Sequence, residues 1–412
     1  MASVRAVARP SLPDHGLSGH RILILNWRDT QHPEGGGSEV YVEQIARGLV
    51  HRGALVTMLC PRFPGAPRRT SLHGITLRRR GGHLSIYFWA PLMYLSGVLG
   101  RQDLIIEIQN GVPFMSARYA RCPVLVVVHH VHKEQWGIVL GARAARFGWW
   151  LESRVAPRVN RRGQYVTVSE ATREELAGLG VDRQRTAIVR NGSPASEAIP
   201  LQRPRAPDPT VLVLGRLVPH KRVELAVRAV ADLRRQFPAL RLMVVGSGWW
   251  HEEIARCARV CGVEDRVMLL GHVDEGAKHD LLAAAWVLAV PSVKEGWGLV
   301  VAEAAGHQTP AIGFRSAGGL TESIIDGRTG VLVDDEAEFT SELGRLLVSP
   351  ALRQRLGRAA RRHAGRFTWE QAQQDFAGKV EELLRPGQPR SGRLSCCRRR
   401  RSAGRWTVRA NR

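Results

Sequence analysis

The sequence predicts an α/β protein of two Rossmann-like domains that face each other across a cleft. The chain has 412 residues, of which 44% are apolar, enough to fill the cores of two domains of ordinary size. Short apolar runs alternate with helical stretches in two series, over residues 20–191 and from residue 210 onward. Strands that alternate with helices form parallel sheets with right-handed crossovers. Between the series, residues 192–209 hold five prolines and little periodicity, which is typical of a linker.

The first series begins with a buried strand at Arg21–Leu25, and residues 39–51 follow it with helical periodicity. Further strands are expected at Leu55–Cys60, residues 103–108 and Val124–Val128. Together these elements predict the first domain, residues 20–191.

Residues 84–100 are the most apolar and aromatic segment of the chain. They are too few to cross a membrane and Pro91 interrupts them, so we expect a helix that is buried or lies at an interface. Insertion into a membrane surface stays an alternative.

The second series repeats the alternation, with a strongly periodic helix over residues 223–237. Its strands are expected at residues 211–215, 242–245, 267–270 and 286–290, and at Ala311–Phe314 and Gly330–Val333. The acidic run 334–336 follows the last strand, and we interpret it as the cap of the next helix rather than as a metal site. Residues 210–366 therefore predict the second domain, and residues 367–385 a final helix capped by Thr368.

Both ends of the chain lie outside these series. Residues 1–19 lack the apolar core of a signal peptide, and no apolar run reaches 18 residues, so a cytoplasmic location without a transmembrane helix is expected. Residues 386–412 hold nine arginines and no acidic residue, which predicts a disordered tail. Without it the formal net charge falls from +23 to +14. A body this basic can meet nucleic acid, anionic lipid or a phosphate-rich ligand, and charge alone does not choose among them.

The six cysteines do not make a disulfide framework in a chain of this length. Cys257 and Cys261 lie four residues apart on an expected helix, and we interpret them as buried thiols. No second pair in the sequence completes a zinc site.

Two glutamates, Glu295 and Glu303, are separated by seven residues in the stretch PSVKEGWGLVVAEAAG. Glu295 lies in a glycine-flanked loop after an apolar strand, and Glu303 lies inside the helix that follows. A strand, a loop and a helix in this order present backbone N–H groups and a carboxylate at the C-terminal edge of a sheet. Because a carboxylate accepts two hydrogen bonds at once, it suits the vicinal hydroxyls of a ribose. The alternative is two surface glutamates.

Two cations lie in the stretch GRLVPHKR, residues 215–222. Arg216 ends the first strand of the second domain, and Lys221 lies five residues on, where a helix opens. Two cations at a helix N-terminus are poorly placed for stability, so they predict a dianionic ligand. The alternative is two solvated surface cations.

A glycine-rich turn, GGGSE at residues 35–39, joins the first strand to its helix. Consecutive glycines let the backbone approach a ligand closely, and the helix N-terminus behind them favours an anion. Taken alone, such a turn is also compatible with a tight turn that binds nothing.

Three histidines, His129, His130 and His132, follow the strand Val124–Val128. Neighbouring side chains on an extended segment point to opposite sides, and no carboxylate nearby in the sequence completes a site. Metal binding is therefore not expected.

In their order and spacing, these motifs resemble those of the retaining glycosyltransferases of family 4, over about residues 20–385. The stretches VTVSEATREEL (residues 166–176) and VRNG (residues 189–192) add to the resemblance. Trp297 stands where the family more often has Phe, and Arg190 where it often has Pro. The resemblance implies a GT-B fold whose last helix crosses back to the N-terminal domain.

The resemblance also implies roles at the donor side. Arg216 and Lys221 hold the nucleotide diphosphate, and Glu303 takes the ribose. Beside the donor sugar and its phosphates lie Glu295, Gly296, Gly298 and Leu299.

The resemblance implies that the first domain forms the side of the cleft opposite the donor residues. There the glycine-rich turn shapes the acceptor side through Gly36, Gly37 and Glu39. His129 reaches the donor sugar and joins the catalytic residues Arg216, Lys221 and Glu295. His130 takes its place if the alignment shifts by one residue.

The implied activity is that of a retaining hexosyltransferase. It moves a sugar from a UDP- or GDP-sugar, used as co-substrate, to an acceptor, with no metal or other cofactor. A lipid-linked or cell-envelope acceptor is expected, with peripheral association at the inner, anionic face of the membrane. Alternatives on the same fold are a sugar phosphorylase and a nucleotide-sugar hydrolase or epimerase. A basic nucleic-acid-binding module is a more distant alternative, because it leaves the glutamate spacing unexplained; no nucleic-acid partner is expected.

Overall fold

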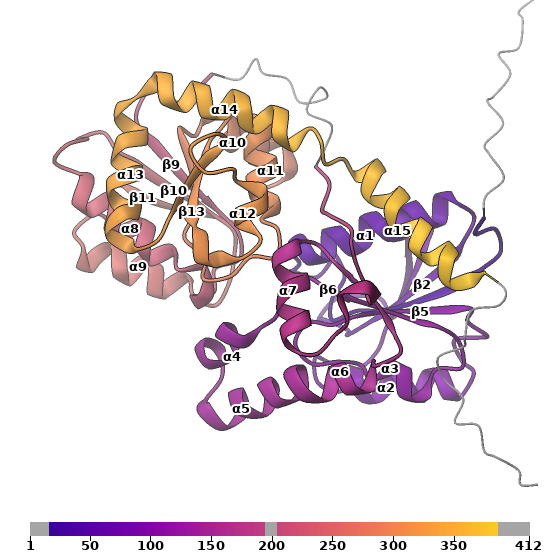
Figure 1. The fold of residues 1–412 in the computed structure, drawn as a ribbon. Helices are drawn as coiled ribbons and strands as arrows, with labels where there is room; N and C mark the ends of the chain where they lie inside the picture. Colours follow the sequence, from indigo (N-terminus) through magenta and orange to yellow (C-terminus); the bar gives the residue numbers. More distant parts are fainter. Residues whose placement is uncertain (1–15, 194–203, 386–412) are drawn as a thin grey trace, which may run out of the picture.

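The computed structural model describes residues 16–193 and 204–385, which form the two α/β domains seen in Figure 1. Residues 1–15, 194–203 and 386–412, which include the expected tail and most of the expected linker, lie outside this description.

Within the described residues, the first domain has an eight-stranded sheet in the order β3-β4-β2-β1-β5-β6-β7-β8. Only the hairpin of β3 and β4 is antiparallel. The strands are β1 (Arg21–Leu25), β2 (Leu55–Cys60), β3 (Arg69–Leu72), β4 (Ile75–Arg79), β5 (Leu104–Ile108), β6 (Val124–Val128), β7 (Gln164–Thr167) and β8 (Thr186–Ile188). The helices are α1 (Gly37–His51), α2 (Ile86–Leu95), α3 (Ser116–Tyr119), α4 (Lys133–Val139), α5 (Ala142–Trp150), α6 (Ala156–Val159) and α7 (Glu170–Gly178), with a π-helical turn at Leu151–Val155 and a 3₁₀ turn at Arg183–Arg185.

The second domain has a parallel six-stranded sheet within the described residues, in the order β11-β10-β9-β12-β13-β14. Its strands are β9 (Thr210–Leu214), β10 (Arg241–Val245), β11 (Val267–Gly271), β12 (Val287–Val290), β13 (Ala311–Phe314) and β14 (Gly330–Val333). Its helices are α8 (Val223–Leu233), α9 (His251–Val260), α10 (Glu275–Ala284), α11 (Leu299–Gly306), α12 (Leu320–Ser323), α13 (Glu336–Val348) and α14 (Pro350–Ala364), with 3₁₀ turns at Pro219–Lys221 and Arg315–Ala317.

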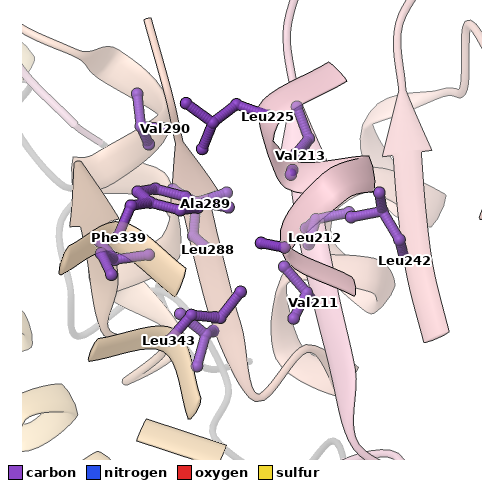
Figure 2. Packing of buried hydrophobic residues seen from close by; sticks show 14 of the residues in the cluster. Val211, Leu212, Val213, Leu225, Leu242, Leu288, Ala289, Val290, Phe339 and Leu343 are labelled. Carbon is purple, nitrogen blue, oxygen red and sulfur yellow. The ribbon is translucent and has the colours of Figure 1, made fainter. Parts of the chain in front are cut away.

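The predicted α/β class with two parallel-sheet domains is confirmed, and every expected strand is present with its ends shifted by at most one residue. These strands were legible because helices cover both faces of a parallel sheet, so its strands read as continuous apolar runs. All five residues of β6, for example, are buried. In the second domain, apolar side chains of β9, β12 and α13, among them Leu212, Leu288 and Phe339, interlock in one core (Figure 2).

The last helix, α15 (Trp369–Leu384), leaves the second domain and packs on α1 of the first (Figure 1). Thr368 caps it, as predicted, by accepting a hydrogen bond from the Gln371 amide. Phe376 and Val380 are fully buried in the core of the first domain. Asp335 likewise caps α13, so the interpretation of the acidic run as a helix cap is confirmed.

Two interpretations need correction, and one is refined. Cys257 and Cys261 are half-buried free thiols rather than buried ones, because α9 lies at the surface of its domain. Leu17, assigned to the N-terminal extension, is fully buried in the first core. Residues 84–100 form the surface helix α2, which buries Ile86 and Ala90 and exposes the opposite face. None of the helices in the described part of the chain is long and apolar enough to span a bilayer.

Candidate functional site

The two loops that carry the expected donor residues meet at the C-terminal edge of the second sheet. Lys221 Nζ donates a hydrogen bond to Glu295 Oε1 and forms an ion pair with it. The backbone joins the same loops, because the Val293 amide donates to the His220 carbonyl at 2.9 Å. Strands β9 and β12 are neighbours in the sheet, so the loops that follow them emerge side by side. The structure thus brings Lys221 and Glu295 into contact.

The position of Lys221 differs from the one expected. The helix α8 does not open at Lys221 but at Val223, because Arg222 has a left-handed backbone (φ +51°) that separates the helix from the 3₁₀ turn before it. Lys221 therefore lies before the helix rather than in its first turn, and the Glu295 carboxylate balances its charge. Arg216 lies two residues beyond the end of β9 rather than at its last residue.

Glu295 has little freedom to move. Its amide donates to the Ala317 carbonyl at 2.9 Å, and its carbonyl accepts from the Gly319 amide at 3.0 Å. Two residues on, Trp297 is 2% exposed and belongs to the hydrophobic core of the first domain, where its ring lies 4.9 Å from that of Phe367. This loop of the second domain is therefore anchored in the first.

Glu303 lies on α11 and is paired with a lysine that the sequence analysis did not identify. Lys278 Nζ, on α10, donates to Glu303 Oε1 at 2.8 Å and also pairs with Glu275. Although burial lowers it, the charge of Glu303 raises the pKa of Lys278 above its ordinary value. Residue spacing within one element could not predict the pair of Lys278 and Glu303, because α10 and α11 are separated by a strand.

The glycine-rich turn of the first domain faces the donor loops of the second. A Cβ atom on Gly37 would lie 2.9 Å from Leu299 Cδ1, and one on Gly36 would lie 3.5 Å from Arg216 Nε. Glu39 is buried and turns back to accept a hydrogen bond from the Gly36 amide at 2.8 Å, which satisfies the amide of the N-cap residue of α1. The carboxylate of Glu39 therefore holds the turn in place.

His129 lies at the same junction, directly after β6. It is 5% exposed, its ring packs edge-on against Tyr41 at 5.2 Å, and its Nε2 has no hydrogen-bond partner. Burial, followed by the charge of His132, lowers the pKa of His129 to about 4. A Cβ atom on Gly296 would lie 2.5 Å from the His129 carbonyl oxygen, so only glycine permits this approach of the two domains. His129 is thus a neutral imidazole at the junction.

The other two histidines have separate partners. His130 contacts Gln135 at 3.2 Å, and burial lowers its pKa well below the ordinary value. His132 Nδ1 lies 2.9 Å from Glu152 Oε1, on the π-helical turn. The carboxylate near His132 was missed in the sequence because it lies twenty residues further on. Among the described residues, no cluster of histidine, cysteine and acidic side chains is arranged to hold a metal ion.

One buried cation was not foreseen. Arg28, three residues beyond the end of β1, is 8% exposed and donates to the Glu34 carbonyl at 3.0 Å. Burial, followed by the charge of Arg216 in the second domain, lowers the pKa of Arg28. Chemically, the junction combines cations from both domains, a neutral imidazole and a fixed carboxylate, which suits an anionic ligand with a polar neighbour.

The comparisons with known proteins agree with this geometry. Residues 35–197 match the model described as Glycosyltransferase Family 4, and residues 197–363 match that of Glycosyl transferases group 1. The D-inositol 3-phosphate glycosyltransferase of Acidothermus cellulolyticus is 30% identical over 401 residues, covering 85% of this chain and 86% of its own. The GDP-mannose-dependent alpha-(1-6)-phosphatidylinositol monomannoside mannosyltransferase of Mycolicibacterium smegmatis is 28% identical, covering 82% and 92%.

Solved structures show the same fold. Sucrose-phosphate synthase from Thermosynechococcus elongatus superposes with a TM-score of 0.75 at 21% identity, over 89% of this chain and 99% of that one. Anabaena HepE in complex with UDP-glucose gives 0.67 at 18% identity, over 88% and 99%. Two parallel-sheet domains of this kind define the GT-B fold. The chain belongs to glycosyltransferase family 4, the group 1 glycosyl transferases.

Proposed function

We propose that this glycosyltransferase moves a hexose from a UDP- or GDP-sugar to an acceptor hydroxyl with retention of anomeric configuration. The observation that carries the proposal is the position of Arg216 beside Gly36 of the facing domain, on the sheet edge that also carries the Lys221–Glu295 pair. One relative is named for its dependence on GDP-mannose, and one structural neighbour was solved with UDP-glucose, so both nucleotides remain candidates.

The proposed chemistry is electrostatic. As the bond between sugar and phosphate loosens, negative charge grows on the departing diphosphate, and Arg216 and Lys221 stabilise it. The departing phosphate takes the proton of the acceptor hydroxyl on the same face, which gives retention without a covalent intermediate. Neutral His129 is proposed to hold a hydroxyl of the donor sugar, and Glu303 the ribose. With these cations in place the reaction requires no metal ion. Losing Lys221 would remove about 3 kcal/mol of transition-state stabilisation.

Glu303 and Glu295 would first have to exchange partners. In the structure Lys278 holds Glu303 and Lys221 holds Glu295. A ribose bound to Glu303 would share its carboxylate with Lys278, and a diphosphate would take over Lys221. The two ion pairs hold both carboxylates in place for the donor.

Relatives point to the acceptor class. One is named for inositol 3-phosphate and another for a phosphatidylinositol monomannoside, so both act on an inositol that carries phosphate, free in one case and lipid-linked in the other. We infer a polyol phosphate acceptor for this chain. The net charge of +14 outside the tail and the exposed apolar face of α2 support the proposal that the enzyme acts at the cytoplasmic face of an anionic membrane.

Thermal unfolding with a panel of UDP, GDP, ADP and their sugar conjugates tests the donor site. A ligand that binds only the folded state raises the melting temperature, and we expect one nucleotide to do so. Glu303→Ala should lose this shift, whereas Glu342→Ala, on α13, should keep it. No shift with any nucleotide would contradict the proposal.

Release of sugar phosphate in the presence of phosphate would favour a phosphorylase, and hydrolysis of the donor without an acceptor would favour a hydrolase. The anomeric proton of the product, observed by NMR, decides between retention and inversion.

A further inference from the structure

A cluster of four aromatic rings, three half-buried and one exposed, lies beside Arg28, at the edge of the first sheet that faces the second domain. Its members are Trp27, His32, Phe63 and His83, and we name it the aromatic shelf. The ring centres of Trp27 and His83 are 5.1 Å apart, those of His32 and His83 5.7 Å, and those of His32 and Phe63 5.0 Å.

Topology explains why these rings meet. Trp27 follows β1, Phe63 follows β2 and His83 follows β4, and these strands are parallel neighbours in the sheet. Their C-terminal ends therefore share one edge, which is also the edge that carries the glycine-rich turn after β1. Residues that are 56 positions apart in the sequence are thus brought to one place by the order of the strands.

The shelf is held rigidly from below by a buried ion pair. Arg79 Nε donates to Asp29 Oδ2 at 2.7 Å, and Arg79 Nη2 donates to Gln31 Oε1 at 2.7 Å. The Arg79 guanidinium also lies 5.1 Å from the ring of Phe63. Although burial raises it, hydrogen bonds from Arg79 and Cys60 lower the pKa of Asp29, so this carboxylate stays charged at neutral pH. A loop fixed in this way presents its neighbours, Trp27 and Arg28, in one orientation.

Arg28 has unused binding capacity at this place. Its guanidinium is 5.5 Å from the ring of Trp27 and contacts Glu34 through both terminal nitrogens, but its buried Nε has no hydrogen-bond partner. A buried guanidinium N–H without a partner is costly, and the Arg28 guanidinium also feels the positive charge of Arg216. An anionic group between the two would satisfy both, since guanidinium groups match phosphate oxygens well.

We propose that the aromatic shelf and Arg28 form the acceptor subsite, and that it takes a cyclic polyol or sugar ring bearing a phosphate group. The apolar face of the ring packs on Trp27 and His83, and Arg28 takes the phosphate. The hydroxyl that accepts the sugar then lies toward Arg216 and the donor. This inference rests on the proposed function and deepens it, because it assigns the acceptor to named residues.

The shelf continues into the exposed face of α2. His83 is followed directly by Leu84, and Phe88 lies one turn further along. Leu84 is 82% exposed and Phe88 65%. A polyol phosphate carried on a lipid could therefore place its head on the shelf and its chains along α2, whereas a free polyol phosphate would use the shelf alone.

Calorimetric titration of the full chain tests the subsite, with the nucleotide that stabilises the protein present at saturation. The probes are myo-inositol 1-phosphate, myo-inositol and inorganic phosphate. We expect the first to bind more tightly than the other two, and Arg28→Gln to weaken it about tenfold or more. Trp27→Ala should weaken both inositol probes, and Trp27→Phe should restore them. Arg235→Gln, two residues beyond the C-terminal end of α8 in the second domain, serves as the matched control. Vesicles of phosphatidylcholine with and without phosphatidylinositol distinguish a lipid-linked source from a free one.

Because Arg28 is buried, its variant must first unfold at the wild-type temperature; if it does not, Arg28→Lys and the two Trp27 variants carry the test. Equal binding of myo-inositol 1-phosphate by the Arg28 and Trp27 variants and by wild type would overturn the subsite. A variant at Arg28 that weakens the nucleotide but leaves the probe unchanged would also overturn it, and would assign Arg28 to the donor diphosphate. Failure of every nucleotide to bind is a different result: it contradicts the donor site, while the probes still test the shelf on the nucleotide-free protein.

Discussion

At the scale of single residues, the junction of the two domains depends on charges and imidazoles that are buried without full compensation. His129 is the clearest case, because its Nε2 has no partner, its ring packs on Tyr41, and its carbonyl lies against the backbone of Gly296. His220, on the 3₁₀ turn Pro219–Lys221, is also buried, and burial together with the charges of Lys221 and Arg216 lowers its pKa to about 3. Both imidazoles are therefore neutral at physiological pH, and protonation of either would introduce a charge into a site that already holds several cations.

We predict that His129 makes folding stability depend on pH. Its pKa is about 4 in the folded protein and near its ordinary value of 6.5 when unfolded, so the unfolded chain binds more protons between these limits. The stability from this group is complete above pH 6.5 and is lost as the pH falls toward 4, by on the order of 3 kcal/mol. Urea unfolding at several pH values measures this. His129→Gln should reduce the slope over this range by up to one proton, because His130 and His220 also have lowered pKa values and keep their share of it. His251→Gln, at a partly exposed position, should leave the slope unchanged. An unaltered slope in the His129 variant would contradict the argument.

At the scale of elements, the sequence predicted the buried strands well and the surface elements poorly. Strands such as β1 and β6 are continuous apolar runs, so their composition predicts that they are buried. The hairpin of β3 and β4 was missed because RTSL is short, polar and half-exposed. The turn between the two strands has positive φ angles at His73 and Gly74, which the polar sequence around it does not indicate.

The candidate site shows the same contrast between residues that the sequence predicted and residues that it did not. Glu295, Lys221 and Arg216 follow strands of one sheet, so local motifs predicted their approach. The roles of Lys278 and Arg28 could not be predicted, because the Lys278–Glu303 pair and the charge of Arg216 near Arg28 arise only through the packing of separate elements. The aromatic shelf required the strand order β4-β2-β1, which periodicity does not supply.

The helix α2 gives a prediction of its own about membrane binding. Phe88 and Leu95 on its exposed face, and Leu84 just before the helix, are exposed. Arg78 Nη1 donates to the Val98 carbonyl just after the helix, and the Arg121 amide donates to the Tyr94 hydroxyl. Apolar side chains beside arginines suit an anionic bilayer surface. We expect the full chain to sediment with anionic vesicles at low salt. Because Phe88 would contribute about 1.5 kcal/mol or more, Phe88→Ser should weaken this binding about tenfold.

The matched control for this helix is Val260→Ser on α9, which removes an equally exposed apolar side chain from the second domain. It should bind vesicles as wild type does. If the wild-type protein ignores anionic vesicles at low salt, or if both variants lose binding equally, α2 is not the membrane-facing element.

At the scale of the whole molecule, a few contacts across the junction hold the two domains together. Glu322, on α12, accepts hydrogen bonds from the Glu170 and Ala171 amides at the start of α7, at 2.6 and 3.3 Å. Its other carboxylate oxygen accepts from Arg190 Nη2 at 2.8 Å. One carboxylate thus caps a helix of the facing domain and neutralises a cation there. Lys294 of the second domain pairs with Glu175 further along α7, so this helix is the main element of the first domain that the second domain holds.

We predict that Glu322→Ala releases this contact without unfolding either domain. Hydrogen exchange at the α7 amides should accelerate about tenfold to a hundredfold, because hydrogen bonds to a charged acceptor each contribute about 1.5–3 kcal/mol. Asp335→Ala is the matched control, since it removes a cap of the same kind from α13 within a single domain. It should accelerate exchange at α13 and leave α7 unchanged. Since closure brings Gly36 and Gly37 against Arg216 and Leu299, the Glu322 variant should also raise the KM of the donor more than it lowers kcat. Unchanged exchange at α7 in the Glu322 variant would mean that packing of Trp297 and α15, rather than this carboxylate, sets the approach of the domains.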